Sequence, residues 1–400
     1  MKTRISVIAL CLLLSAQLST PAWAEDGRAF PRTATFSTLI MTPLNIEGMT
    51  GDNRGNLYAP GRALLPGQPY PVWRINIAKP TLVVVGTIPA PGPTGLCLPL
   101  GLAFDQGGKL YVTETDRIYR FLPDAGTPPI ADLFATGVPG TNALAFDDDG
   151  NLWTGDGTTG QGRVWKINAA GVVTEVFRVQ PMANEVNLVA GVGGVGRDVR
   201  TLPPGTITVT PTTRNAANTL GSQPLVANGL AFDKHGDLLV ADTARGAIWK
   251  VTFDRRGNLR SKTGCDTTFT ANTLCLDNIF VTHPLLEGAD GIALDHDDNI
   301  WVSANERNAV VGVTDKGRVI EVFRNAPDAT TKLRNVGPLE FPTSPFLSDR
   351  KFCTASSDAN RRDNSPNAAG QINNPAGPFR GKISCMNERV QVRGVSLPVR

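Results

Sequence analysis

The hydrophobic pattern of the chain repeats one short unit. Each copy has an apolar stretch, an Asp, a short polar turn that ends in Gly or a substitute, and a second apolar stretch. Alternation with period two and abundant Val, Ile and Thr favour β-strands, and no stretch shows a sustained helical period. Five copies are clear and the last one is weaker: 47–60, 101–113, 142–154, 228–241, 290–303 and 341–355.

The spacing of these copies predicts a ring of blades. A third apolar stretch follows each copy, usually with a fourth, and the turn aspartates stand roughly 40 to 90 residues apart. Propeller blades of four strands take about 40 to 50 residues, so the longer intervals indicate loop insertions. We predict an all-β fold, a six-bladed β-propeller with four-stranded blades, forming one domain over 25–400. The segment 34–40 could add an outer strand to the last blade or could be a free lead-in.

The first residues have the pattern of an export signal. Lys2 and Arg4 precede an apolar run over 5–16, and Ala22 and Ala24 form a small-x-small cleavage pattern. The run is shorter than the roughly 20 residues that a membrane-spanning helix needs. We therefore predict a signal peptide over 1–24 and a periplasmic or secreted protein without membrane insertion.

Export makes disulfides the expected state of the cysteines. Two cysteines of the last blade fall on neighbouring predicted strands, and two others bracket a short polar loop. No CxxC spacing indicates a zinc site. We predict the pairs Cys353–Cys385 and Cys265–Cys275, and we interpret the remaining Cys97 as a partly buried thiol without a catalytic role.

The numbers of basic and acidic residues are nearly equal. The chain carries 39 basic and 36 acidic residues. Such a balance gives no electrostatic reason to expect binding to nucleic acid or to an anionic membrane.

Four oxygen-bearing residues stand at the same place in four copies of the repeat: Glu47, Asn142, Asn228 and Asp290. A ring would bring them together on its axis. Two carboxylates and two amides form a hard oxygen set that suits calcium, with magnesium or manganese less favoured and zinc left open. Polar residues at strand starts can instead cap turns, but convergent carboxylates would be costly without a cation. We predict a metal site.

The long insertions are expected to share one face of the ring with these four residues. They lie at about 178–227, 252–289 and 358–378, with a shorter one at 89–100. If each candidate ligand stands at the start of the innermost strand of its blade, these loops would surround a pocket over the central opening of the ring. Tolerated surface insertions are an equal alternative.

Three further residues are candidates for the site. His283 lies in the loop that leads to Asp290 and could act as a general base, because its unperturbed pKa is near 6.5. A plain loop role is the alternative. Asp156 and Asp242 end second strands on the expected ligand face and could support the ligands from a second layer, or cap turns.

Several short motifs stand in successive blades. They are Glu47-Gly48, Asn142, Asn228-Gly229-Leu230 with Asp242, and Asp290-Gly291 followed by Asp295, Asn299 and Trp301-Val302. In this order around six blades, the motifs resemble the senescence marker protein, gluconolactonase and luciferin-regenerating enzyme family over about 45–392. The resemblance implies a six-bladed propeller with one divalent ion, usually calcium, and lactone hydrolysis. It also implies that Glu47, Asn142, Asn228 and Asp290 hold the metal and that Asp290 assists the attacking water.

Departures from that family's pattern weaken the case for a sugar substrate. Met49 replaces the usual Pro, Ala143 and Leu144 replace the usual Asp-Gly, and Gly140 stands where sugar lactonases carry Arg. Our leading hypothesis is an exported, calcium-dependent hydrolase that acts on a small-molecule lactone or related ester. The alternative is a non-catalytic propeller that binds a ligand or a protein partner, with the metal only structural.

Overall fold

A computed structural model gives the architecture of the chain. It describes residues 29–395 except 32, 53, 63–66, 91–97, 181–224, 268, 328, 330–333, 335–336 and 358–379. The predicted signal peptide, Cys97 and most of two predicted insertions, 178–227 and 358–378, lie outside the described residues.

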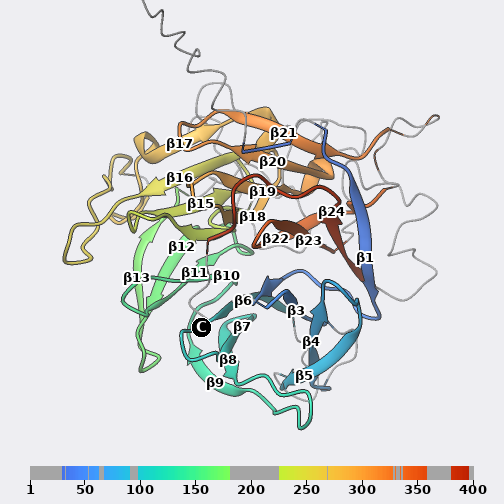
Figure 1. Ribbon diagram of the computed structural model, residues 1–400. Helices are drawn as coiled ribbons and strands as arrows, with labels where there is room; N and C mark the ends of the chain where they lie inside the picture. The colour runs from blue at the N-terminus through green and yellow to red at the C-terminus, as the bar shows by residue number, and fades with distance from the viewer. Residues whose placement is uncertain are drawn as a thin grey trace, which may run out of the picture.

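Six four-stranded sheets, numbered here as blades 1 to 6, stand around a common axis (Figure 1). This confirms the six-bladed propeller. Blade 1 contains β2 (Thr50–Gly51), β3 (Asn56–Pro60), β4 (Tyr70–Asn76) and β5 (Leu82–Ile88). Blade 2 contains β6 (Pro99–Phe104), β7 (Leu110–Glu114), β8 (Arg117–Phe121) and β9 (Asp132–Thr136). Blade 3 contains β10 (Thr141–Phe146), β11 (Leu152–Asp156), β12 (Arg163–Ile167) and β13 (Val173–Arg178).

The other three blades follow the same antiparallel order, with three short 3-10 turns between strands in the described part of the chain. Blade 4 contains β14 (Leu230–Phe232), β15 (Leu238–Asp242), β16 (Ala247–Val251) and β17 (Ile279–Thr282). Blade 5 contains β18 (Ala289–Leu294), β19 (Ile300–Ala304), β20 (Ala309–Val313) and β21 (Val319–Arg324). Blade 6 contains β22 (Pro342–Ser348), β23 (Lys351–Ser356), β24 (Gly381–Met386) and β1 (Phe36–Thr42). The turns are η4 (Leu276–Asn278), η5 (Pro284–Leu286) and η6 (Asn305–Arg307).

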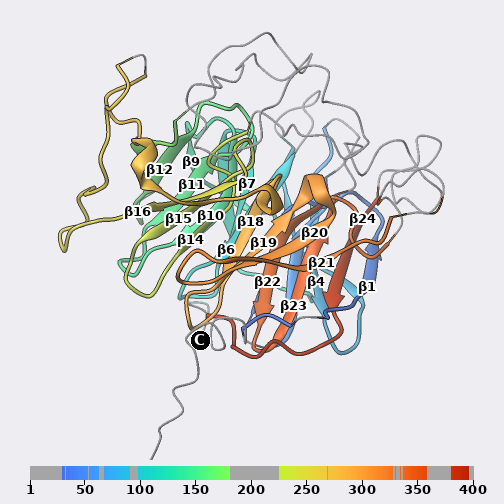
Figure 2. The same ribbon diagram turned by 90° about the horizontal axis from the view of Figure 1, so that it is seen from above.

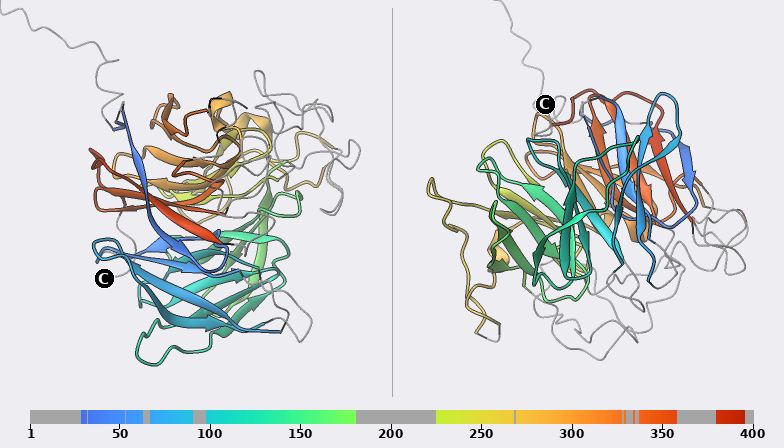
Figure 3. Two further views of the ribbon diagram at one scale, coloured as in Figure 1. Left: turned by 90° about the vertical axis from the view of Figure 1, so that its right-hand side faces the viewer. Right: turned by 90° about the horizontal axis from the view of Figure 1, so that it is seen from below.

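The first strand of the described chain closes the ring. β1 pairs antiparallel with β24, so that Ile40 faces Ile383 and the outer strand of blade 6 comes from the N-terminal side (Figures 1 and 3). Of the two alternatives for 34–40, the outer strand is therefore the observed one. Each blade completes its sheet with sequence-adjacent strands except this last one, whose closure joins distant parts of the chain.

Both predicted disulfides form. Cys353 on β23 pairs in register with Cys385 on β24, which links the two middle strands of the closing blade. Cys265 and Cys275 close the loop after blade 4's third strand. Two disulfides among the described residues fit an oxidising compartment.

Removing the closing disulfide should destabilise the fold. Cys353 and Cys385 are 32 residues apart in sequence, and a cross-link over a loop of that length contributes about 3 to 4 kcal/mol by restricting the unfolded chain. We expect a double Cys353→Ser, Cys385→Ser variant to lose about that much unfolding free energy in urea titrations. The matched Cys265→Ser, Cys275→Ser variant, which opens a shorter loop outside the sheets, should lose less.

The repeated turn aspartate is structural. In each of blades 1 to 5 it accepts a backbone hydrogen bond from the residue four places on, which fixes the hairpin. In four blades it also accepts from an aromatic side chain six places on, at distances of 2.8 to 3.4 Å: Asp52 from Tyr58, Asp105 from Tyr111, Asp147 from Trp153 and Asp295 from Trp301.

Apolar side chains fill the spaces between neighbouring blades. The interface of blades 3 and 4 is typical: Trp153 and Phe177 pack against Val240 and Trp249, and all four are buried. The innermost strand of each blade contacts the innermost strands of its two neighbours. Residues at the starts of these strands are therefore held close to one axis.

Blade 4 differs from the prediction in one respect. The stretch 252–289 was expected to be an insertion, but β17 lies inside it and supplies the fourth strand of the blade. The excursion that precedes β17 takes part in three isolated bridges, one of them to Arg178 of blade 3, and part of it projects from the ring (yellow in Figure 2). No helix among the described residues is both long and apolar enough to cross a membrane.

Candidate metal centre

Backbone irregularities turn the candidate ligands toward the axis. Asn142 lies in a break of the β10–β11 register between Thr141 and Leu144, and Asp290 lies in the matching break between Ala289 and Ile292. A bulge of this kind adds an unpaired residue and re-aims its side chain. Glu47 and Asn228 stand just before the innermost strands of blades 1 and 4 at the same offset from their turn aspartates.

Six equivalent residues, one per blade, form what we call the axial positions. They are Glu47, Leu100, Asn142, Asn228, Asp290 and Thr343. In four cases the next residue is a glycine whose missing Cβ leaves room for the axial carbonyl of the following blade. A Cβ on those glycines would stand 1.4 to 2.5 Å from that oxygen: Gly48 from Leu100, Gly101 from Asn142, Gly229 from Asp290 and Gly291 from Thr343.

Three of the four polar candidates are joined by hydrogen bonds. Asn142 Nδ2 donates to Asn228 Oδ1 at 2.9 Å. Asn228 in turn bonds the carboxylate of Asp290, and its Nδ2 donates to Thr243 at 3.1 Å. Asn305 Nδ2 donates to Asp290 Oδ2 at 2.8 Å. The structure therefore brings Asn142, Asn228 and Asp290 together in a buried cluster.

Glu47 interacts with this cluster through its negative charge. Burial, followed by the negative charge of Glu47, raises the pKa of Asp290 well above its usual value, while bonds from Asn305 and Asn228 and the charge of Arg62 act in the opposite direction. Glu47 itself forms an ion pair with the guanidinium of Arg62. Two carboxylates thus share the axis with a single guanidinium.

This donor set fits a hard divalent cation. Two carboxylates and one guanidinium leave one negative charge at the site, and a raised carboxyl pKa indicates that the site favours added positive charge. Each amide oxygen has two lone pairs, so Asn228 Oδ1 can accept from Asn142 and still face an ion. No three His, Cys, Asp or Glu side chains cluster in the described ranges, so an ion here would depend on the amides as well.

Asp156 and Asp242 cap turns, which is the second of the two roles that the sequence left open. The backbone N–H of Thr159 donates to Asp156 Oδ1 at 2.9 Å, and that of Arg245 donates to Asp242 Oδ1 at 3.0 Å. Asp242 bonds Arg245 at 2.8 Å and Trp249 at 2.9 Å, and Asp156 bonds Thr159 and Arg163. The residues just after those strands contact the cluster instead. The Thr243 hydroxyl accepts a hydrogen bond from Asn228, and the Asn305 amide donates one to Asp290. Gly157 packs against the Asn142 side chain.

His283 stands at the end of β17, the outermost strand of blade 4. Its Nδ1 accepts the backbone N–H of Leu285 at 3.1 Å and so caps η5. Burial, followed by the charge of Arg307, lowers its pKa, which keeps the ring neutral near pH 7. A neutral imidazole could accept a proton, but the Nδ1 atom is engaged in the cap.

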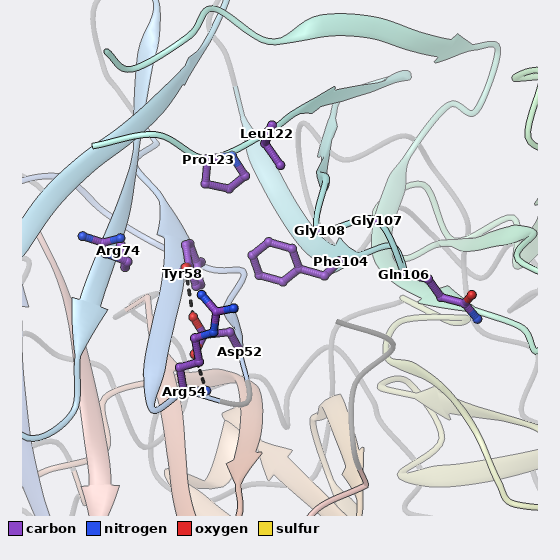
Figure 4. Close-up of a pocket in the computed structure, with 10 residues that line it drawn as sticks. All are labelled: Asp52, Arg54, Tyr58, Arg74, Phe104, Gln106, Gly107, Gly108, Leu122 and Pro123. Atoms are coloured by element: carbon purple, nitrogen blue, oxygen red, sulfur yellow. Dashed lines mark hydrogen bonds between the residues drawn. The ribbon is translucent and has the colours of Figure 1, made fainter. Parts of the chain in front are cut away.

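A separate cavity of about 330 Å³ opens between the turns of blades 1 and 2. Figure 4 shows Arg54 reaching toward the space between the Tyr58 and Phe104 rings. Asp52 on its wall accepts from the Tyr58 hydroxyl and from the Arg54 backbone N–H. These polar groups already serve the hairpin turn of blade 1, so the cavity adds no chemistry to the axial cluster.

Comparison with known proteins identifies a family for the chain. The model of the SMP-30/Gluconolactonase/LRE-like region matches residues 83–334, which is more than half of the chain. The chain belongs to this family. The matched region contains Asn142, Asn228 and Asp290, whereas Glu47 precedes it. A comparison with curated protein sequences gives no match.

Several solved structures share the fold at low sequence identity. A luciferin-regenerating enzyme is 12% identical, with a TM-score of 0.56 over 92% of this chain and 99% of its own. A calcium-binding protein, regucalcin from Agrobacterium tumefaciens str. C58, is 16% identical, with a TM-score of 0.53 over 91% and 97%. A gluconolactonase from Xanthomonas campestris is 15% identical, with a TM-score of 0.50 over 92% of each chain.

Proposed function

We propose that this protein is a calcium-dependent hydrolase of lactones or related esters that works in the periplasm or outside the cell. The observation that carries the proposal is the pair of carboxylates, Glu47 and Asp290, that shares the propeller axis with two amides. Family membership supports lactonase-type chemistry, and the two disulfides support export. Regucalcin, a neighbour in fold, is named as a calcium-binding protein.

The residues that would hold calcium are Glu47, Asn142, Asn228 and Asp290. When bound, the ion would polarise the carbonyl oxygen of the substrate and lower the pKa of a nearby water. Four protein ligands are fewer than calcium's usual six to eight oxygens, so positions remain for water and substrate. Magnesium or manganese could occupy the same oxygen set less well.

Asp290 is the group that we assign to the attacking water. Its Oδ2 accepts from Asn305, and this bond fixes the orientation of the carboxylate. A carboxylate held in this orientation beside the ion would accept the proton of the attacking water. Asn305 is therefore a positioning residue for Asp290.

His283 is the competing general base. A His283→Gln variant keeps a hydrogen-bond acceptor for Leu285 but cannot take up a proton near pH 7. We expect kcat to change less than about threefold if Asp290 is the base. A loss of about a hundredfold would instead assign the proton transfer to His283.

A screen of metal-stripped and calcium-loaded protein tests the proposal. The substrates should include neutral and charged lactones, aryl esters and phosphotriesters. We expect lactone or ester hydrolysis that disappears with a chelator and returns with calcium. No hydrolysis in any class, with one calcium still bound, would leave the ion structural and favour a ligand-binding propeller.

A further inference from the structure

Arg62 enters the axial cluster from a loop that sequence reasoning did not consider. It follows β3 by two residues, and its backbone N–H donates to the carbonyl of Asn45 at 2.7 Å in an isolated antiparallel bridge. Asn45 is itself held by the carbonyl of Ser357 at 2.6 Å. The backbone at Arg62 is therefore fixed to blades 1 and 6 beside Glu47.

The Arg62–Glu47 ion pair is partly open to solvent, unlike the Arg245–Asp242 pair at the same end of the blades. Arg245 and Asp242 are both fully buried, and Asp156, the partner of Arg163, is also fully buried. In the Arg62–Glu47 pair both side chains reach solvent, with 24% and 17% exposed. Arg245 thus braces the fold, whereas Arg62 presents a charge at the open side of the cluster.

The net charge of the cluster indicates which kind of ligand the Arg62 guanidinium can bind. Glu47, Asp290 and Arg62 sum to one negative charge, so a bound divalent cation would make the site positive by one. A guanidinium has five N–H donors in a planar fork, and Glu47 is bonded through the Nη1 end. The remaining donors match the two oxygens of a carboxylate, and the loaded site favours an anion.

We propose that Arg62 is a specificity residue that binds a carboxylate on the substrate, so that the preferred substrate class is a lactone or ester bearing a negative charge. This inference rests on the proposed function, because it names the substrate of the same site. A neutral ring would meet a site with one unmatched positive charge. A carboxylated ring would neutralise that charge and be oriented by it.

Two substrates that differ by one carboxylate test the inference: γ-butyrolactone and 5-oxotetrahydrofuran-2-carboxylate. Steady-state kinetics and calorimetric binding should be measured on calcium-loaded wild type, Arg62→Gln and Arg62→Lys. Arg117→Gln is the matched control, since it removes one positive charge from the start of β8, where Arg117 pairs with the neighbouring Asp116. Thermal melts establish that each variant is folded.

Wild type should prefer the carboxylated ring. Arg62→Gln should lose about ten- to hundredfold in kcat/KM on that ring, chiefly through KM, because a hydrogen bond to a charged group is worth about 1.5 to 3 kcal/mol. The loss on the neutral ring should be about tenfold smaller, Arg62→Lys should retain part of the preference, and Arg117→Gln should match wild type. Equal losses on both rings, or a wild-type preference for the neutral ring, would overturn the inference.

Binding separates this inference from the hydrolase proposal. If neither ring is hydrolysed, the hydrolase proposal is decided by the wider substrate screen, but the carboxylated ring should still bind wild type about ten- to hundredfold more tightly than Arg62→Gln. Equal affinity of wild type and Arg62→Gln for that ring would overturn the role of Arg62 whether or not turnover occurs. Arg62→Lys gives the same comparison if the glutamine variant does not fold.

Discussion

Asp290→Asn should lower lactone turnover by about a thousandfold or more while the fold is retained. The substitution keeps the shape of the side chain and an acceptor for Asn305. It removes one of the two carboxylates that we assign to the cation and the proton acceptor that we assign to the water. Both contributions stabilise the transition state of hydrolysis, so without them kcat should fall much more than KM rises. Steady-state kinetics at a calcium concentration that saturates wild type check this, with circular dichroism as the test of folding.

The same variant should be more stable than wild type when no metal is present. Burial and Glu47 raise the pKa of Asp290 in the folded state, so the charged form is disfavoured there. In wild type without metal, that group's contribution to stability falls as pH rises from its ordinary pKa near 3.8 toward the raised value. Asn carries no charge to be penalised at pH 7. Metal-stripped Asp290→Asn should therefore melt higher, and calcium should raise only the wild-type melting temperature.

Asp295→Asn is the matched control for both effects. Asp295 is a buried carboxylate of the same blade, where it accepts from Asn299 and Trp301 in the hairpin turn. Its replacement should weaken the turn but leave calcium binding and turnover per folded molecule close to wild type. Full activity in Asp290→Asn, or an equal loss of activity in Asp295→Asn, would contradict the assignment of Asp290.

Gly48→Ala should destabilise the fold by more than about 4 kcal/mol. A Cβ at Gly48 would lie 1.4 Å from the carbonyl oxygen of Leu100 and 2.7 Å from Leu102 Cδ1, so the innermost strands of blades 1 and 2 would have to separate. Overlap with backbone cannot be relieved by a rotamer change, and effects above 4 kcal/mol are expected only for such mechanisms. Urea titration of the two proteins measures the difference.

Gly55→Ala separates this overlap from the general effect of losing a glycine. Gly55 lies in the turn of the same blade with φ of +78°, and a Cβ there would meet no atom within 4 Å. Its replacement should cost only about 1 kcal/mol, from the left-handed backbone conformation. Equal losses for Gly48→Ala and Gly55→Ala would mean that the blades do not approach as closely as described.

The architecture was predictable because a local signal repeats. Each turn aspartate fixes its hairpin through bonds to residues four and six places on, so a single motif specifies two strands wherever it occurs. Asp295 with Asn299 and Trp301 shows the full pattern. The closing strand was not decided by sequence, since the pairing of β1 with β24 joins segments more than 300 residues apart. β17 was not predicted as the fourth strand of blade 4, because the excursion before it separates it in sequence from the third strand, β16.

The axial candidates were found because they occupy equal places in equal repeats. The residues that support them were not predicted, for a reason that lies in strand geometry. Side chains alternate between the two faces of a strand, so two adjacent residues at the end of a strand have different surroundings. Asp242 packs between blades with Trp249, whereas Thr243 reaches Asn228. A search one residue beyond each second strand would have found Thr243 and Asn305. The same place in blade 1, ten residues after the turn aspartate Asp52, holds Arg62, so the search would have found this residue too.

The measurement that tests the central claim most directly is a calorimetric titration of calcium into the metal-stripped protein. The account predicts one ion per chain, bound by Glu47, Asn142, Asn228 and Asp290, with binding lost in Asp290→Asn and retained in Asp295→Asn. Magnesium and manganese should bind more weakly to the same site. A folded wild-type protein that binds none of these ions, or that binds calcium equally well after Asp290→Asn, would contradict the assignment of a metal centre to the propeller axis.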